Sequence, residues 1–214
     1  MVEEVIAAAR AGLASDTIVI DHSTTSPALT AKRMEQMHAA GVNYLHCPVF
    51  MGPPAARNAQ GSMMVAGPKM LYDRVAADLA KMAGKVIYVG ERCDLAAANK
   101  LFGNAMIIGM AAIMADVLTL AQANGVPGKD AIELLGLLDL NGMVKGRGAS
   151  MAAGNFTPSF ELAMARKDVG LMESTANRPM AALPAIAARM DALIAQGHGA
   201  DDACVLGVDA VQRS

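Results

Sequence analysis

The pattern of apolar and helix-breaking residues changes near residue 92, and this change constrains the fold more than any other feature of the chain. Before it, short β-branched or apolar runs alternate with helical stretches. After it, residues 94–214 form helical runs separated by glycine and proline, with no segment typical of a strand. Strands that alternate with helices indicate parallel β-α-β units. We therefore expect an α/β domain over residues 1–92 and an all-helical domain over residues 93–214.

The elements expected in each part follow from apolar runs and from the positions of glycine and proline. In the first part, strands are predicted at residues 17–21, within 42–49, at 62–66 and at 85–89, and helices at residues 2–13, 27–40 and 68–82. In the second part, helices are predicted at residues 94–124, 129–138, 142–153, 160–176, 181–196 and 200–212. Ser26 and Asp201 are the expected N-terminal caps of the helices at 27–40 and 200–212.

Charge and cysteine content exclude several classes of protein. The net charge is -2 and no cluster of lysine and arginine occurs, so we expect neither nucleic acid nor a membrane surface as a partner. The three cysteines (Cys47, Cys93, Cys204) are far apart, and the four histidines lack the spacing of metal ligands. We expect no metal site, no disulfide framework, no signal peptide and a reducing cytoplasm.

The apolar stretch from Leu101 to Ala121 requires a decision between a membrane span and a core helix. Asn104 and Asp116 interrupt it, and its longest apolar part is shorter than the ~20 residues that a span needs. We therefore expect a buried helix of a soluble domain.

Lys100 stands at the beginning of this apolar helix, and Asn104 lies four residues later on the same helical face. A lysine in an apolar segment is costly because its charged form must lose water. Such lysines often transfer protons. The alternative is that the stem of Lys100 lies along the core while its amine reaches water. Both interpretations remain open from these residues alone.

Two loops leave the ends of predicted strands, where open α/β sheets bind ligands. In the loop Asp21–Pro27, hydroxyls and backbone amides could hold a phosphate or a ribose, or could simply connect strand to helix. In Pro48–Pro54, Gly52 could let amides approach an anion, or could form an ordinary turn. We interpret the charged group Ala165–Asp168 as a solvated helix face with pairs of aspartate and lysine, with a functional role as the alternative. No GxGxxG motif, the usual pyrophosphate loop, occurs in the chain.

Taken in order, these segments resemble the β-hydroxyacid dehydrogenase family, which includes 3-hydroxyisobutyrate dehydrogenase, tartronate semialdehyde reductase and the 6-phosphogluconate dehydrogenase nucleotide-binding superfamily. Asp21–Pro27 is similar to the family's D-x-S-T-x-S-P cofactor loop, and Cys47–Gly67 resembles its A-P-V-S-G-G and G-T-L-x-x-M-V-G-G substrate segment. Lys167 with Asp168 resembles the K-D-L motif, and Gly197–Asp202 resembles the closing G-x-G-x-x-D. The resemblance runs through essentially all 214 residues. Each motif is weak alone, and their combined order is specific.

The resemblance implies roles for individual residues. Lys100 falls on the family's catalytic lysine, a general acid in reduction and a general base in oxidation, and Asn104 falls on its substrate-binding asparagine. Thr24 falls on a cofactor-contacting position, and Lys167 on the lysine that reaches the nicotinamide end of the cofactor. The implied reaction is hydride transfer between NAD or NADP and a small hydroxyacid or semialdehyde-like substrate.

The resemblance also implies a fold and an assembly. The expected architecture is a partial Rossmann-type parallel sheet followed by an all-α domain, with a long helix between the two. The family forms homodimers or homotetramers through its helices, so we expect the same of this chain.

Two departures from the family pattern affect the substrate site. Phe50, Met51 and Gly52 stand where the family usually has Ser-Gly-Gly, which binds the substrate carboxylate. Gly103 stands in place of one of two asparagines that usually follow the lysine. Both changes suggest a bulkier or less polar substrate than a small hydroxyacid.

A third departure concerns the front of the chain. Family members begin with a Rossmann half that carries G-L-G-x-M-G, and this sequence starts after it. We expect a truncated form whose strand 17–21 has an open edge and whose residues do not reveal the choice between NAD and NADP. The alternative function is a non-catalytic fragment, or a helical oligomerisation module, that is unable to bind the cofactor.

Overall fold

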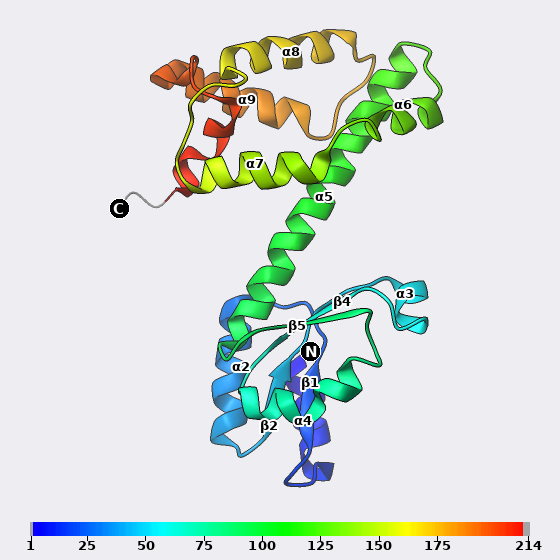
Figure 1. Ribbon diagram of the computed structural model, residues 1–214, viewed down its shortest axis with the longest axis vertical. Helices are drawn as coiled ribbons and strands as arrows, with labels where there is room; N and C mark the ends of the chain where they lie inside the picture. The colour runs from blue at the N-terminus through cyan, green and yellow to red at the C-terminus, as the bar shows by residue number, and fades with distance from the viewer. Residues whose placement is uncertain (1, 212–214) are drawn as a thin grey trace. The chain divides into compact units, whose positions relative to one another are not determined.

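The computed structural model describes residues 2–211 and divides into two compact units that meet inside helix α5, between Met106 and Ile107 (Figure 1). The sheet unit contains α1 (Val2–Ala9), η1 (Arg10–Gly12), β1 (Ile18–Asp21), α2 (Pro27–Ala39), β2 (Asn43–His46), β3 (Val49–Phe50), α3 (Pro53–Arg57), β4 (Ser62–Ala66), α4 (Lys69–Leu79), β5 (Lys85–Gly90) and the first part of α5 (Cys93–Ala123). The helical unit contains the rest of α5, then α6 (Gly128–Leu135), α7 (Leu140–Ala152), α8 (Leu162–Thr175), α9 (Leu183–Leu193), η2 (Ile194–His198) and η3 (Ala203–Ala210).

The sheet of the first unit is mixed. β1 runs parallel to β2, with Asp21 opposite His46, and β4 runs parallel to β5. β4 is antiparallel to both β2 and β3, with Val49 opposite Met63. The connection from β3 through α3 to β4 is short, and a parallel partner would need a longer crossover. The predicted α/β fold is confirmed, and two pairings of the sheet, β2 with β4 and β3 with β4, are antiparallel.

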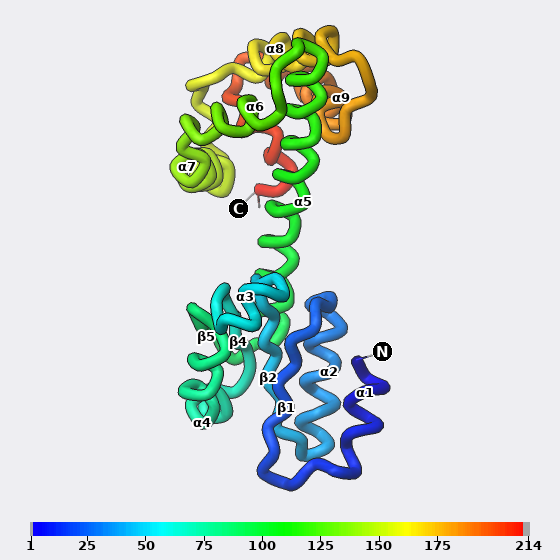
Figure 2. Tube along the Cα trace, turned by 90° about the vertical axis from the view of Figure 1, so that its right-hand side faces the viewer, coloured from blue at the N-terminus to red at the C-terminus, as the bar shows by residue number. Residues whose placement is uncertain are grey.

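Side chains alternate between the two faces of the sheet and build a core on each. One face packs against α4 through Leu45, Met63 and Val65. The other face packs Tyr44 and Val19 against α1 and α2. Figure 2 shows α2 and α4 on opposite sides of the strands. The loops that leave the strand ends are therefore fixed by a core on both sides of the sheet.

The helical unit has its own core between α8 and α9, made of seven buried residues: Leu162, Ala165, Val169, Ala187, Met190, Leu193 and Val205. A buried carboxylate ties α5 to this core. Both oxygens of Asp116, on α5, accept hydrogen bonds from the amides of Ala181, Ala182 and Leu183 at the start of α9. The second half of α5 is thereby built into the helical unit.

Helix α5 differs from the expectation of a buried helix. Its 31 residues make it the one helix in the described part of the chain that is long and apolar enough to cross a membrane by length and composition. Only 6% of its most apolar 18-residue window is buried. Large apolar side chains such as Phe102, Ile107 and Ile108 are more than half exposed, because no other described element of this chain covers them.

Several boundaries differ from the sequence-based prediction. The second strand is split into β2 and β3 at Cys47-Pro48, and α3 forms within the predicted irregular loop. The final helix is a 3-10 helix that ends at Ala210, and Gln212, the predicted end, lies outside the described residues. Ser26 caps α2, because its Oγ accepts a hydrogen bond from the Leu29 amide at 3.3 Å. The predicted cap Asp201 is wrong, since Asp202 accepts from the Cys204 amide instead.

Candidate functional site

The Lys100 amine meets the end of strand β3. Its Nζ donates a hydrogen bond to the carbonyl oxygen of Val49 at 2.7 Å and lies 3.9 Å from the centre of the Phe50 ring. The lysine is partly buried on α5, and burial lowers the pKa of its amine. The amine is therefore fixed in direction, and its neutral form is more accessible than that of a solvated lysine.

The Phe50 ring fills the space in front of Gly103. It packs in a cluster with Met64, Ala66 and Ala96 on the α5 side of the sheet. A Cβ atom added to Gly103 would lie 2.3 Å from Cζ of Phe50, which is closer than any real contact of this kind. Glycine at position 103 is thus the residue that allows the ring to rest against α5 beside Lys100.

The other predicted substrate residues are Asn104, Gly52 and Met51, and Met51 is not brought to this contact. Asn104 follows Lys100 by one helical turn and is partly exposed, and no hydrogen bond holds its amide within residues 2–211. Gly52 is exposed and begins α3 as its N-terminal cap. Met51 packs against the α4 side of the sheet, the face opposite to the Phe50 cluster. Substrate binding by Asn104, Met51 and Gly52 stays a prediction.

The predicted cofactor loop leaves strand β1, which pairs with β2, the strand that precedes the Phe50 segment. The Ser23 amide donates to Oδ1 of Asp21 at 2.8 Å, and Nδ1 of His22 lies 2.7 Å from the carbonyl oxygen of Cys47. The Ser23 hydroxyl is buried without a hydrogen-bond partner among the described residues, and Thr24 is exposed. This loop and the segment that carries Phe50 therefore leave adjacent strand ends, with hydroxyls available for a ligand.

A buried charge network supports the base of this loop. Oδ2 of Asp21 accepts hydrogen bonds from Tyr44 at 2.6 Å and Arg33 at 3.1 Å, and Arg33 also donates to Oε1 of exposed Glu3 at 2.6 Å. Burial would raise the pKa of Asp21, but the nearby His46 ring, whose Nδ1 lies 3.5 Å from Oδ2, and the donors of Ser23 and Tyr44 outweigh it and hold that pKa below its usual range. The His46 ring is fully buried beside Asp21 without a hydrogen bond from either nitrogen in the described chain. No local pattern around Arg33 indicated that its side chain would be buried.

Lys167 belongs to the helical unit. It lies on α8, its side chain is 57% exposed, and its Nζ is 3.3 Å from Oδ1 of Asp168. Its neighbour Arg166 pairs with Asp191 and Glu173. The charged group expected at 165–168 thus forms surface ion pairs, and contact of Lys167 with a cofactor stays a prediction.

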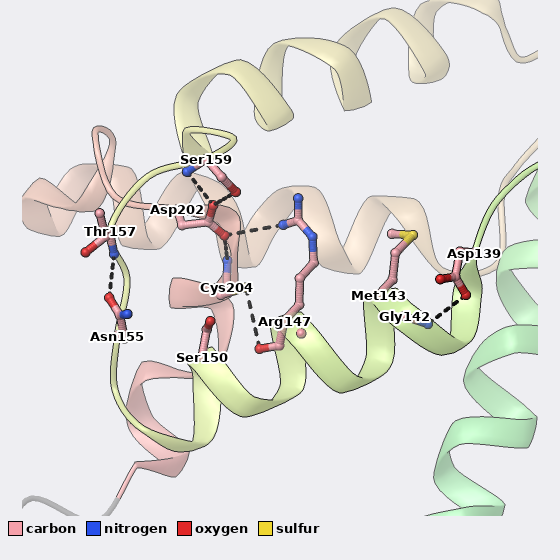
Figure 3. A pocket seen from close by; sticks show the side chains of 11 residues that line it. Asp139, Gly142, Met143, Arg147, Ser150, Asn155, Thr157, Ser159, Asp202 and Cys204 are labelled. Atoms are coloured by element: carbon pink, nitrogen blue, oxygen red, sulfur yellow. Dashed lines mark hydrogen bonds and ion pairs between the residues drawn. The ribbon is translucent and has the colours of Figure 1, made fainter.

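The helical unit also contains a polar cavity of about 520 Å³ beside α7 (Figure 3). Asp202 forms its floor and accepts from the amides of Ser159, Phe160 and Cys204, from the Ser159 hydroxyl and from Arg147. Although burial would raise the pKa of Asp202, these hydrogen bonds hold it far below the usual range. Because every oxygen of Asp202 is already engaged, this carboxylate fixes the loops around the cavity.

The residues that the sequence interpretation missed are those whose partners are distant in the chain. Asp116 was noted only as an interruption of an apolar stretch, and Asp202 only as the last residue of a motif. The available signal for Asp116 was an acidic residue within an apolar segment, whereas Asp202 follows another aspartate in a glycine-rich turn and had no such signal. Such a residue requires hydrogen-bond partners when buried.

Two family descriptions match consecutive parts of the chain. Residues 1–90 match the NAD binding domain of 6-phosphogluconate dehydrogenase. Residues 95–207, more than half of the chain, match the domain described as NAD-binding of NADP-dependent 3-hydroxyisobutyrate dehydrogenase. The chain belongs to the β-hydroxyacid dehydrogenase family. The family resemblance expected from the order of motifs is therefore confirmed.

Curated relatives in this β-hydroxyacid dehydrogenase family include enzymes from an insect and a bacterium. The mitochondrial 3-hydroxyisobutyrate dehydrogenase of Drosophila melanogaster is 28% identical over 81% of this chain and 56% of the relative. The 3-sulfolactaldehyde reductase of Escherichia coli (strain K12) is 27% identical over 89% of this chain and 65% of the relative. The chain thus spans about three fifths of the length of these relatives.

The fold is also that of a solved structure. An imine reductase from Streptomyces aurantiacus matches with a TM-score of 0.86 and 20% identity, over 99% of this chain and 76% of the other. At this identity the likeness concerns the fold alone. It supports the predicted arrangement of a Rossmann-type sheet followed by helices.

Proposed function

We propose that this chain carries the proton-transfer and substrate residues of an NAD- or NADP-dependent oxidoreductase. The reaction is reversible hydride transfer between nicotinamide and the carbon of a small hydroxyacid or related carbonyl compound. The observation that carries this proposal is the Lys100 amine, held by the Val49 carbonyl at 2.7 Å and against the Phe50 ring. Family membership supports the same assignment.

Lys100 acts on the oxygen of the reacting carbon. In reduction, its ammonium gives a proton to the carbonyl oxygen as that oxygen gains negative charge, and in oxidation the neutral amine takes the proton back. Burial lowers the pKa of Lys100, which brings the two forms closer in free energy at neutral pH. The Asn104 amide, one turn later, has donors and an acceptor for the same substrate.

The chain offers polar groups that fit one part of the dinucleotide. The buried Ser23 hydroxyl is without a partner among the described residues, and the Thr24 hydroxyl is exposed in the same loop. When bound, the dinucleotide supplies or accepts the hydride. Ser23, Thr24 and the Lys167 amine are the groups that we propose would hold it, by hydrogen bonds to its sugar, phosphate or amide oxygens.

The test is loss of turnover without loss of folding. Lys100→Met is compared with Lys81→Met, which removes an exposed lysine paired with Asp78. We expect consumption of NADH or NADPH with small aldehydes to fall by about 100-fold or more in Lys100→Met, with an unchanged melting temperature. Lys81→Met should keep full turnover. Wild-type turnover in Lys100→Met would overturn the role of Lys100.

A second candidate is a helical oligomerisation module that binds no cofactor. The exposed apolar side chains of α5 favour it, because such a surface is normally covered by a partner. We propose that two or four copies associate through the helices in either case. Titration of NADH and NADPH fluorescence separates the candidates: binding supports the oxidoreductase, and absence of binding together with a stable oligomer supports the module.

A further inference from the structure

We propose that Phe50 and Gly103 form a matched pair that selects carbonyl substrates with a hydrocarbon group, rather than a carboxylate, next to the Lys100 amine. This inference rests on the oxidoreductase function proposed above and specifies its substrate class. It follows from three features of the structure: the contact of the ring with α5, the direction of the amine, and the aromatic face of the ring, which has no donor for an anion.

The first feature is the contact between the ring and the helix. A Cβ at position 103 would lie 2.3 Å from Cζ and 2.7 Å from Cε1 of Phe50. A side chain at 103 and a benzyl group at 50 therefore exclude each other. The ring also packs in a cluster with Met64 and Ala96, so a shift away from position 103 would disturb that packing. The two residues must be considered together as one apolar wall.

The second feature is the direction of the Lys100 amine. An ammonium group has three N–H donors. One of these is used by the carbonyl oxygen of Val49 at 2.7 Å, and the Phe50 ring lies 3.9 Å from the nitrogen, within the range of a cation–π contact. The two remaining donors can hold a substrate oxygen. The substrate that fits this arrangement brings one oxygen to the amine and an apolar group to the ring.

The third feature is the aromatic face of Phe50, which offers an anion no favourable contact. An aromatic face carries partial negative charge and has no hydrogen-bond donor, so it attracts the lysine and repels a carboxylate. A carboxylate placed beside it would lose water without gaining partners. The remaining polar side chain one turn away is Asn104, which is neutral. A carboxylate would therefore compete with the carbonyl oxygen for Lys100 rather than occupy a place of its own.

The experiment compares two aldehydes that differ at one end. Butanal and succinic semialdehyde share their carbon skeleton, and a methyl group in the first is a carboxylate in the second. We expect the wild-type chain to prefer butanal in kcat/KM by at least about tenfold. The double variant Phe50→Ser/Gly103→Asn should shift this ratio toward succinic semialdehyde by a similar factor. A ratio that is unchanged in the double variant would overturn the proposal.

A second measurement does not depend on turnover. The two corresponding alcohols, butan-1-ol and 4-hydroxybutanoate, are tested for protection of Lys100 against an amine-reactive reagent, with modified peptides quantified by mass spectrometry. Lys81 on the same chain is the internal control for reagent reactivity. Butan-1-ol should slow the labelling of Lys100 and not that of Lys81. Protection that is absent, or that is stronger with 4-hydroxybutanoate, overturns the selection of a hydrocarbon group. Protection without any turnover contradicts only the oxidoreductase function.

A third measurement shows whether the double variant folds as intended. Gly103→Ala alone should lower the melting temperature by several degrees because the new Cβ collides with the ring. Phe50→Ala/Gly103→Ala should melt no lower than Phe50→Ala, because the collision is removed. If Gly103→Ala lowers the melting temperature equally in the wild-type protein and in Phe50→Ala, the two residues are not a matched pair.

Discussion

The two units satisfy their buried carboxylates in different ways. In the sheet unit, Oδ2 of Asp21 is held by the side chains of Arg33 and Tyr44, and its Oδ1 accepts one backbone amide, that of Ser23. In the helical unit, Asp116 takes all three of its hydrogen bonds from backbone amides, and Asp202 accepts three of its five from amides. All three carboxylates are at least 92% buried, so the contrast concerns the partners and not the depth.

This difference follows from how the backbone N–H groups are paired in each unit. Strands pair their own N–H and C=O groups, so a buried acid in a sheet finds side chains as partners. Helix starts and the loops between helices leave N–H groups without partners, and a carboxylate satisfies several of them at once. The side-chain network can be replaced residue by residue. The backbone donors remain in place whatever residue replaces the aspartate.

The largest expected effect comes from removing the backbone-paired acid of the helical unit. Asp202→Ala should lower the free energy of unfolding by about 4 kcal/mol, because buried amides of Ser159, Phe160 and Cys204 lose their acceptor. Chemical denaturation followed by circular dichroism measures this. Asp201→Ala, next in the chain and paired with His198 at the surface, is the control and should cost less than about 0.5 kcal/mol. If Asp202→Ala and Asp201→Ala lowered the free energy of unfolding equally, the backbone hydrogen bonds of Asp202 would not set it apart from a surface acid.

A double-mutant cycle tests the side-chain network of the sheet unit. Asp21→Asn and Arg33→Met should each cost about 3 kcal/mol, because each leaves part of a buried ion pair without its partner. The double variant should cost about 2 kcal/mol less than the sum, since neither charge is then left alone. Chemical denaturation of the wild type, the two single variants and the double variant gives the coupling free energy between Asp21 and Arg33. Additive losses would mean that Asp21, like Asp202, depends mainly on backbone donors.

The smallest effect concerns Asp116 and its dependence on pH. Hydrogen bonds from the Leu183, Ala181 and Ala182 amides outweigh burial and lower the pKa of Asp116. Its stabilisation is therefore complete above its unfolded-state pKa of about 3.9 and is lost as the pH falls further. Asp116→Asn should cost about 1–2 kcal/mol at neutral pH and much less near pH 3.

The control for this pH series is Asp168→Asn, which removes an exposed acid of the same unit. Its cost should stay near zero at both pH values. If Asp116→Asn costs the same at neutral and acidic pH, the carboxylate charge is not what holds the start of α9.

Local patterns predicted the elements well where glycine marks their ends. β4 lies at the predicted residues 62–66, between Gly61 and Gly67. Prediction failed where short-range signals conflict, as at Pro48, which lacks an N–H group and falls between β2 and β3. Helix α3 was missed because two prolines were interpreted as a loop, although proline is favoured in the first turn of a helix.

The candidate site was predictable in its residues and not in its contacts. The order of motifs pointed to Lys100, and the departures at Phe50 and Gly103 were visible in the sequence. That these two residues touch depends on how β3 meets α5, about fifty residues later in the chain. The partners of Asp116 are backbone amides 65 to 67 residues away. No local pattern specifies such partners, because every residue except proline carries an amide N–H.

The contact between Phe50 and Gly103 also constrains the order in which substitutions at positions 50 and 103 can occur. A lineage that exchanges an apolar wall for polar side chains must first replace the phenylalanine by a smaller residue, and only then can position 103 gain a side chain. In the opposite direction, position 103 must become glycine before a large ring can arise at position 50. One route in each direction avoids an intermediate in which the two side chains overlap.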